Sequence, residues 1–301
     1  MASRVKATGG LRLPHPYPNS TVPNTNNRLL DASTQERFYA TITERYMAFC
    51  TVAGDSTSLL KSFASLHLTD QPPPTPTPRS SSSSSLSAPG PAPPPTSDDL
   101  SHILAALRKL REGIVASKRA DLFATQAYLF AIRLGVLCAH PETYHPALLH
   151  LLGAMQHHHH HSRSSGSSLT ALEQREAASY LVLDAACRRG DLAEAYRLRS
   201  AHGLRDAKVD AVLGALARDD WVAFFRARRG VDGHRARLLG FAEDGVRRHL
   251  LKAFGRAYLS VPLEFLEASA GLGWEEMRAR YAVGWEVQGE RVVIRKVQGR
   301  A

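Results

Sequence analysis

The sequence predicts an all-α fold, a stack of helical hairpins followed by a small C-terminal module that contains a β-hairpin. Apolar residues recur at helical spacing through most of the 301-residue chain. Short turns carrying glycine or aspartate separate the successive helices. An alternating pattern around a glycine turn appears near the C-terminus. The length allows one or two domains.

The N-terminal third contains two stretches of low complexity. Residues 1–30 are rich in proline, asparagine and glycine, and we expect a disordered tail there. Helices are predicted over 31–68, with Asp31 or Ser33 as the first cap. Residues 69–98 contain PPPTPTP and a serine run, which predict a disordered loop that acts as a spacer or as a ligand for an aromatic groove.

Residues 99–244 are expected to form the helical-repeat part, similar to tetratricopeptide or HEAT hairpins. The segment AACRRGDLAEAYRL indicates two antiparallel helices, with Gly190 after the first and Asp191 capping the second. A His- and Ser-rich stretch at 156–168 interrupts this part and is expected to be a disordered loop. A dedicated metal site needs separated ligands in fixed geometry. The five histidines at 157–161 therefore predict a polar loop, with neither metal nor cofactor.

The C-terminal module, residues 245–297, has the pattern of three helices and a two-stranded hairpin. Pro262 suits the first turn of the second helix, and Gly289 suits the hairpin turn. Three helices and a two-stranded wing make a winged helix. The expected elements are helices at 245–261, 262–269 and 274–281 and strands at 285–287 and 291–295.

This combination resembles a PCI domain, a helical repeat joined to a winged helix. The resemblance rests on AYLSVPLEFLEASAGLGWEEMRARYAVGWEVQGERVVIRK (257–296), with helical segments at 111–138 and 179–206, and spans about 100–296. It is nearest to the small-subunit branch: the small non-ATPase subunit of the proteasome lid, subunit eight of the COP9 signalosome and the k subunit of translation initiation factor three. The proline- and histidine-rich insertions depart from those compact subunits, as in a divergent member.

The resemblance implies a non-catalytic scaffold subunit that assembles with other PCI subunits of a large complex. In that family the winged helix pairs edge to edge with others, which requires an exposed hairpin edge. The edge is expected at 291–296 or at 285–287. The residues predicted to bind a partner there are Trp285, Val287, Arg291, Val293 and Arg295.

Nucleic-acid binding is the alternative function, because winged helices often place their third helix in the major groove. Here Trp274, Met277 and Tyr281 are expected in the core, leaving two acidic and two basic side chains. Acidic residues at the N-terminal end, Glu275 and Glu276, disfavour an approach to phosphates and argue against specific DNA readout.

A basic stripe on the preceding helix is the better polyanion site. Arg248, Lys252 and Arg256 lie at i, i+4 and i+8. Like charges at this spacing repel each other. The stripe is either a solvated face or a contact for RNA or an acidic protein surface.

Charge and motifs narrow the function classes further. The net charge is +10 and the pI is about 9.8. The excess of basic residues is spread thinly over the whole chain. This balance permits nucleic-acid or acidic partners without choosing between them. Gly54-Asp55-Ser56 resembles an esterase nucleophile block but follows a helix. We expect no enzyme activity and no small-molecule substrate.

The cysteines and the N-terminus bear on the cell compartment. Cys50, Cys138 and Cys187 are far apart, which favours buried free thiols in a reducing compartment. The first residues lack the apolar stretch of a secretory signal, and no run of about 18 apolar residues occurs. We therefore expect a protein of the cytoplasm and nucleus without membrane contact.

Overall fold

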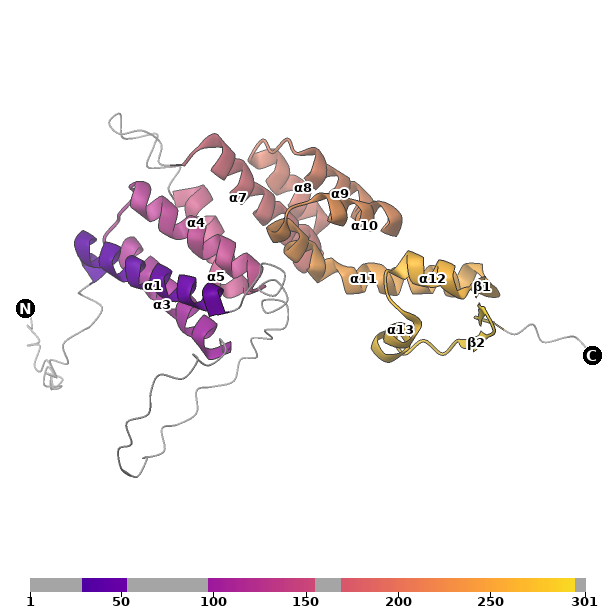
Figure 1. Ribbon diagram of the computed structural model, residues 1–301. Coiled ribbons are helices and arrows are strands. Elements are labelled where there is room, and N and C mark those ends of the chain that lie inside the picture. The colour runs from indigo at the N-terminus through magenta and orange to yellow at the C-terminus, as the bar shows by residue number, and fades with distance from the viewer. Residues whose placement is uncertain (1–28, 53–96, 155–168, 296–301) are drawn as a thin grey trace, which may run out of the picture.

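The computed structural model describes residues 29–52, 97–154 and 169–295, and most of them are helical (Figure 1). The predicted helix after Gly54, most of the proline- and serine-rich loop and the histidine run lie outside the described residues. The elements are α1 (Ala32–Val52), α3 (Ser97–Ala116), α4 (Leu122–Leu137), α5 (Pro141–Leu149), the π-helical η2 (His150–Ala154), α7 (Ala171–Leu183), the π-helical η3 (Asp184–Arg188), α8 (Leu192–Ala201), α9 (Ala207–Ala217), α10 (Trp221–Gly230), α11 (Gly233–Ala257), β1 (Ser260–Pro262), α12 (Leu263–Ala270), α13 (Trp274–Tyr281), β2 (Glu286–Gln288) and β3 (Arg291–Val293).

Aspartate caps start many of the helices. An aspartate carboxylate accepts a backbone N–H from the first turn and satisfies a donor that has no partner within the helix. The turn between α7 and α8 follows the prediction: Gly190 has φ +68°, and the Asp191 carboxylate accepts from Glu194 N at 2.8 Å. The N-caps of this kind are Asp121, Asp191, Asp206, Asp220 and Asp232.

The helix predicted to end before Gly190 is not regular to its end. It changes at Asp184 into η3, where Arg189 N donates to Asp184 O at 3.1 Å. The Asp184 carboxylate is fully buried and accepts from the Tyr144 hydroxyl at 2.5 Å and from Arg188 Nε at 2.6 Å. The wider turn thus holds a buried polar group that links α5 to η3, which local periodicity did not indicate.

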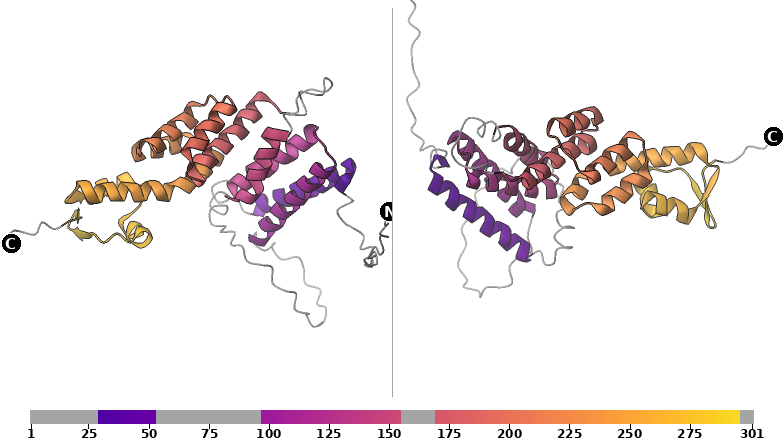
Figure 2. Two further views of the ribbon diagram at one scale, coloured as in Figure 1. Left: turned by 180° about the vertical axis from the view of Figure 1, so that it is seen from behind. Right: turned by 90° about the horizontal axis from the view of Figure 1, so that it is seen from above.

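Two hydrophobic clusters meet on α11. The larger cluster runs from α1 to the first half of α11 and includes Leu107, Ile132 and Leu238. The smaller cluster contains Leu250 and Phe254 from the second half of α11, together with the side chains of the C-terminal module. In each view, α11 leads from the helical stack to this module, which lies at the opposite end of the molecule from α1 (Figures 1 and 2). One continuous helix therefore carries the module.

The C-terminal sheet has three antiparallel strands in the order β1-β3-β2. The sequence predicted only two, because Ser260–Pro262 was assigned to the helices on either side. Instead α11 ends at Ala257, and Val261 pairs with Val292. Pro262 precedes α12 as its N-cap instead of opening it. The hairpin turn is as predicted, with Gly289 at φ +59°.

Other expectations concern the membrane, metals and thiols. No helix in the described ranges is long and apolar enough to cross a membrane. Those ranges also contain no group of three or more His, Cys, Asp or Glu residues suited to a metal. All three cysteines are free, and Cys138 and Cys187 are buried as predicted, whereas Cys50 is partly exposed.

Candidate partner-binding site

The predicted residues of the hairpin occupy different environments. Val287 lies on an outer strand with 38% of its surface exposed. Val293 is partly buried, and Arg291 and Arg295 are exposed. The Trp285 indole lies against α11, where a methyl group on Gly255 would meet its Cζ2 atom at 3.5 Å. Part of the Trp285 surface is therefore already in contact with α11, and only the rest is available to a partner.

The sheet order decides which hairpin strand has an open edge. β3 lies between β1 and β2, so both of its edges are paired. The expectation of an exposed edge at 291–296 is therefore wrong for the described residues 291–293, because the unforeseen β1 covers one side. The other predicted edge, 285–287, remains open along β2.

The strand register shows which backbone groups face that edge. Leu263 N donates to Glu290 O at 2.9 Å and Ile294 N donates to Leu259 O at 2.8 Å. Bonding residues alternate along an antiparallel pair, so Val292 faces β1 while its two neighbours face β2. Val287 stands opposite Val292. Its N–H and C=O consequently point away from β3, to the open edge.

The second outer strand, β1, offers a poorer edge. By the same alternation Ser260 and Pro262 face outward, and proline has no N–H to donate. An Arg291 Nη2 atom also donates to Ser260 O at 3.4 Å and to Ser260 Oγ at 3.1 Å. β1 is therefore largely closed to a further strand, whereas β2 is not.

The basic stripe is exposed and extends to the sheet. The side chains of Arg248, Lys252 and Arg256 all project from α11 into solvent. Arg295 Nη2 donates to Arg256 O at 2.6 Å, where the last carbonyls of α11 lack helical partners. The structure thus brings Arg295 to the end of the stripe, a proximity that the sequence did not indicate.

The third helix of the module, α13, has its charges balanced. Trp274 and Met277 are buried as predicted. Arg280 Nη2 lies 2.9 Å from Asp244 Oδ1, which also accepts from the Tyr281 hydroxyl at 2.9 Å. Burial opposes ionisation of Asp244, but these hydrogen bonds outweigh it and hold the pKa of its carboxyl below the usual value.

Sequence reasoning missed the residue that joins α11 to α12. Arg247 is 7% exposed, and its Nε donates to Ala270 O at 3.0 Å. Its Nη1 lies 3.0 Å from Glu243 Oε2, and its guanidinium stands 5.2 Å from the centre of the Phe225 ring. Arg247 shares a helix face with Leu250, Leu251 and Phe254, and this position was the available signal.

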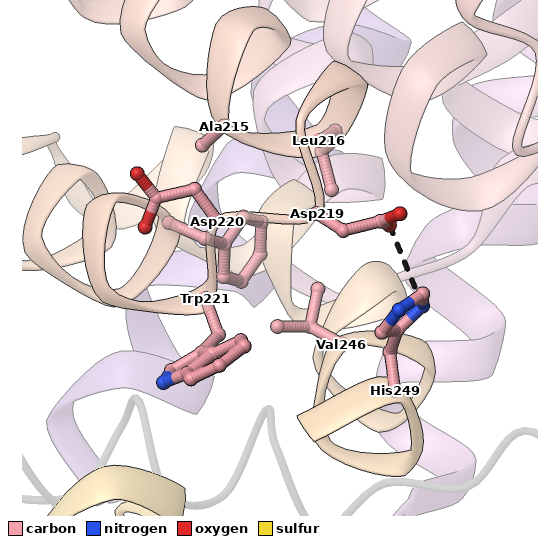
Figure 3. A pocket seen from close by; sticks show the side chains of 8 residues that line it. Ala215, Leu216, Asp219, Asp220, Trp221, Val246 and His249 are labelled. Atoms are coloured by element: carbon pink, nitrogen blue, oxygen red, sulfur yellow. Dashed lines mark ion pairs between the residues drawn. The ribbon is translucent and has the colours of Figure 1, made fainter. Parts of the chain in front are cut away.

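A small hollow marks the place where the α9–α10 turn meets α11 (Figure 3). Trp221, Phe224 and Val246 line its apolar wall. At the rim, His249 Nδ1 lies 3.5 Å from Asp219 Oδ1, and both side chains are more than half exposed. A surface pair of this kind contributes at most about 1 kcal/mol. The hollow contains none of the predicted partner-binding residues.

No protein-family model matches the chain, and no curated protein matches it.

Proposed function

We propose that this protein is a non-catalytic assembly subunit that joins a PCI-type complex through its C-terminal module. We further propose that the module is a winged helix, with α11, α12 and α13 as its helices and β2–β3 as its wing. The element order helix, strand, helix, helix, strand, strand supports this assignment. The helical stack, of tetratricopeptide or HEAT type, would set the position of the module through α11.

The open edge of β2 is the observation that carries the proposal. Val287 directs one donor and one acceptor away from the sheet, and its exposed side chain adds apolar surface. A strand from another chain can satisfy such groups by adding to the sheet, so that main-chain hydrogen bonds supply affinity. The partner is therefore expected to be another subunit with its own strand edge, in the proteasome lid, the COP9 signalosome or translation initiation factor three.

The substitution Val287→Pro tests this contact selectively. Proline removes the N–H that faces outward and leaves the bonds between β2 and β3 in place, as Pro262 already does on β1. The full-length tagged variant should lose its partner subunits in co-purification. Val287→Ala keeps the N–H and should retain them. Truncation after Tyr281 should abolish assembly altogether.

The co-purification result is informative only if both Val287 variants are folded. Circular dichroism should give the same helical signal and melting temperature for both Val287 variants. If folded Val287→Pro protein recovers every partner at the wild-type ratio, as judged by mass spectrometry, then the β2 edge is not the contact.

A further inference from the structure

Three exposed cations lie along one face of α11. Arg248, Lys252 and Arg256 form no ion pair with any described residue. The next cations along the chain, Arg278 and Arg280 on α13, pair with Glu275 and with Asp244 and Glu276. The stripe on α11 therefore keeps its full positive charge.

Two arginines of the hairpin extend this charge. Arg295 binds the Arg256 carbonyl, and Arg291 binds the Ser260 hydroxyl. Both of these hydrogen-bond partners are neutral. We call the five side chains together, Arg248, Lys252, Arg256, Arg291 and Arg295, the α11–β3 basic face.

The acidic side chains of the module lie outside its α11 segment. Glu264 and Glu267 lie on α12, Glu275 and Glu276 lie on α13, and Glu286 and Glu290 lie in the hairpin, where Glu286 stands opposite Val293. Glu267 is also engaged, because its Oε1 accepts from Trp274 N at 2.7 Å. Spacing of four residues makes the cations of α11 repel one another. An external polyanion would relieve this repulsion, whereas α12 and α13 would repel it.

Two partly exposed aromatic residues lie near the C-terminal end of the stripe. Trp285 is partly exposed and lies on α11 at Gly255, next to Arg256. Tyr258 follows at the end of the helix with 42% of its surface exposed, and its ring centre lies 5.2 Å from that of Phe254. Surfaces for single-stranded nucleic acids combine cations along the backbone with rings on which bases stack. Four of the five cations are arginines, whose planar forks suit phosphate.

We propose that the α11–β3 basic face binds the phosphate backbone of a single-stranded nucleic acid, with Tyr258 and Trp285 stacking on its bases. This goes beyond assembly through β2 and does not depend on it. The contact uses the first helix and the sheet of the module instead of α13. The first turn of α13 carries Glu275 and Glu276, which would repel phosphates.

Fluorescence anisotropy with the full-length protein tests the proposal. The probes are fluorescein-labelled 20-nucleotide single strands of RNA and DNA, the corresponding duplex, and a labelled polyglutamate peptide. Five phosphate contacts predict a slope of about −3.5 in log affinity against log salt for a single strand. The triple variant Arg248→Ala/Lys252→Ala/Arg256→Ala should make that slope shallower by about 2 and weaken binding at least tenfold at about 50 mM salt.

A matched control removes the same charge from the helical stack. Arg205→Ala/Lys208→Ala/Arg229→Ala replaces three exposed cations that form no ion pair with any described residue, and it should leave slope and affinity unchanged. Tyr258→Leu should weaken binding by about fivefold or more without changing the slope, because stacking is not ionic. RNA against DNA shows which sugar is preferred, and either result supports a backbone site.

Several results would overturn the proposal. These are no binding of single strands at about 50 mM salt, an equal loss in the two triple variants, and polyglutamate binding as tight as that of RNA. The last result would identify an acidic protein surface as the partner. Val287→Pro should bind RNA like the wild type, so failure of this proposal and failure of the assembly proposal are distinguishable.

Discussion

Replacing Arg247 with methionine should destabilise the junction between the helical stack and the C-terminal module. Methionine keeps an unbranched apolar stem but removes the guanidinium, which lies over the Phe225 ring. The change deletes the hydrogen bond to Ala270 O and the ion pair with Glu243, both at 3.0 Å. The last carbonyls of α12 then lose a charged donor.

The expected loss is about 3 kcal/mol in the free energy of unfolding. A buried hydrogen bond from a charged donor contributes about 1.5–3 kcal/mol, and removal of one member of a buried ion pair costs about 3–5 kcal/mol. We expect a loss at the low end of the range for an ion pair, because Glu243 keeps its ion pair with Arg228. Glu243 is thus not left as an isolated buried charge.

Urea unfolding with two probes measures this effect. Trp221, Trp274 and Trp285 are the only tryptophans of the chain. Each packs with the smaller hydrophobic cluster, so tryptophan fluorescence reports on the module while circular dichroism reports on all helices. In Arg247→Met the fluorescence transition should move to lower urea than the dichroism transition.

The neighbouring substitution Arg248→Met is the control. Arg248 is exposed, so its loss should change the free energy of unfolding by no more than about 0.5 kcal/mol. A double-mutant cycle with Glu243→Gln should give a coupling energy of about 1–3 kcal/mol. If Arg247→Met is as stable as Arg248→Met, Arg247 does not join the module to the stack.

Two further substitutions test the turn and the buried tyrosines. Gly190→Ala places a Cβ at φ +68° and should lower the free energy of unfolding, measured by thermal denaturation, by about 1 kcal/mol. Gly233→Ala lies at a helical position with open space around it and should leave the free energy of unfolding unchanged. Burial raises the pKa of Tyr128 to about 12. The folded state therefore holds the hydroxyl proton of Tyr128 more tightly than the unfolded state does. Below pH 10 this preference does not reduce the free energy of unfolding. As the pH rises from the unfolded to the folded pKa of Tyr128, the free energy of unfolding should fall by about 1.4 kcal/mol per pH unit. Tyr128→Phe should remove that loss in unfolding measured at rising pH, and an unchanged slope, equal to that of the exposed Tyr196→Phe, would contradict it.

Local rules accounted for much of the helical part. Asp191 follows Gly190 directly, and this dipeptide alone predicts the end of one helix and the cap of the next. The apolar spacing of Trp274 and Met277 likewise predicted their burial in α13. Such features depend on neighbours within a few residues, which the sequence displays.

The candidate site depended more on distant contacts. Strand β1 has three residues and lies between two helical patterns, so no periodicity revealed it. It forms because Val261 pairs with Val292, across 31 positions. That pairing closes one side of β3 and transfers the open edge to β2. The sequence had offered both edges without a basis for choice.

By itself the sequence determined the helical class, the turns and the apolar face of each helix, because backbone preference and periodicity are local. Only the tertiary structure decided that Arg247 is buried while Arg248 is exposed, that Arg295 joins the stripe at Arg256, and that Val287 faces an open edge. Each of these depends on which distant element supplies a partner, and a one-dimensional pattern does not contain that information.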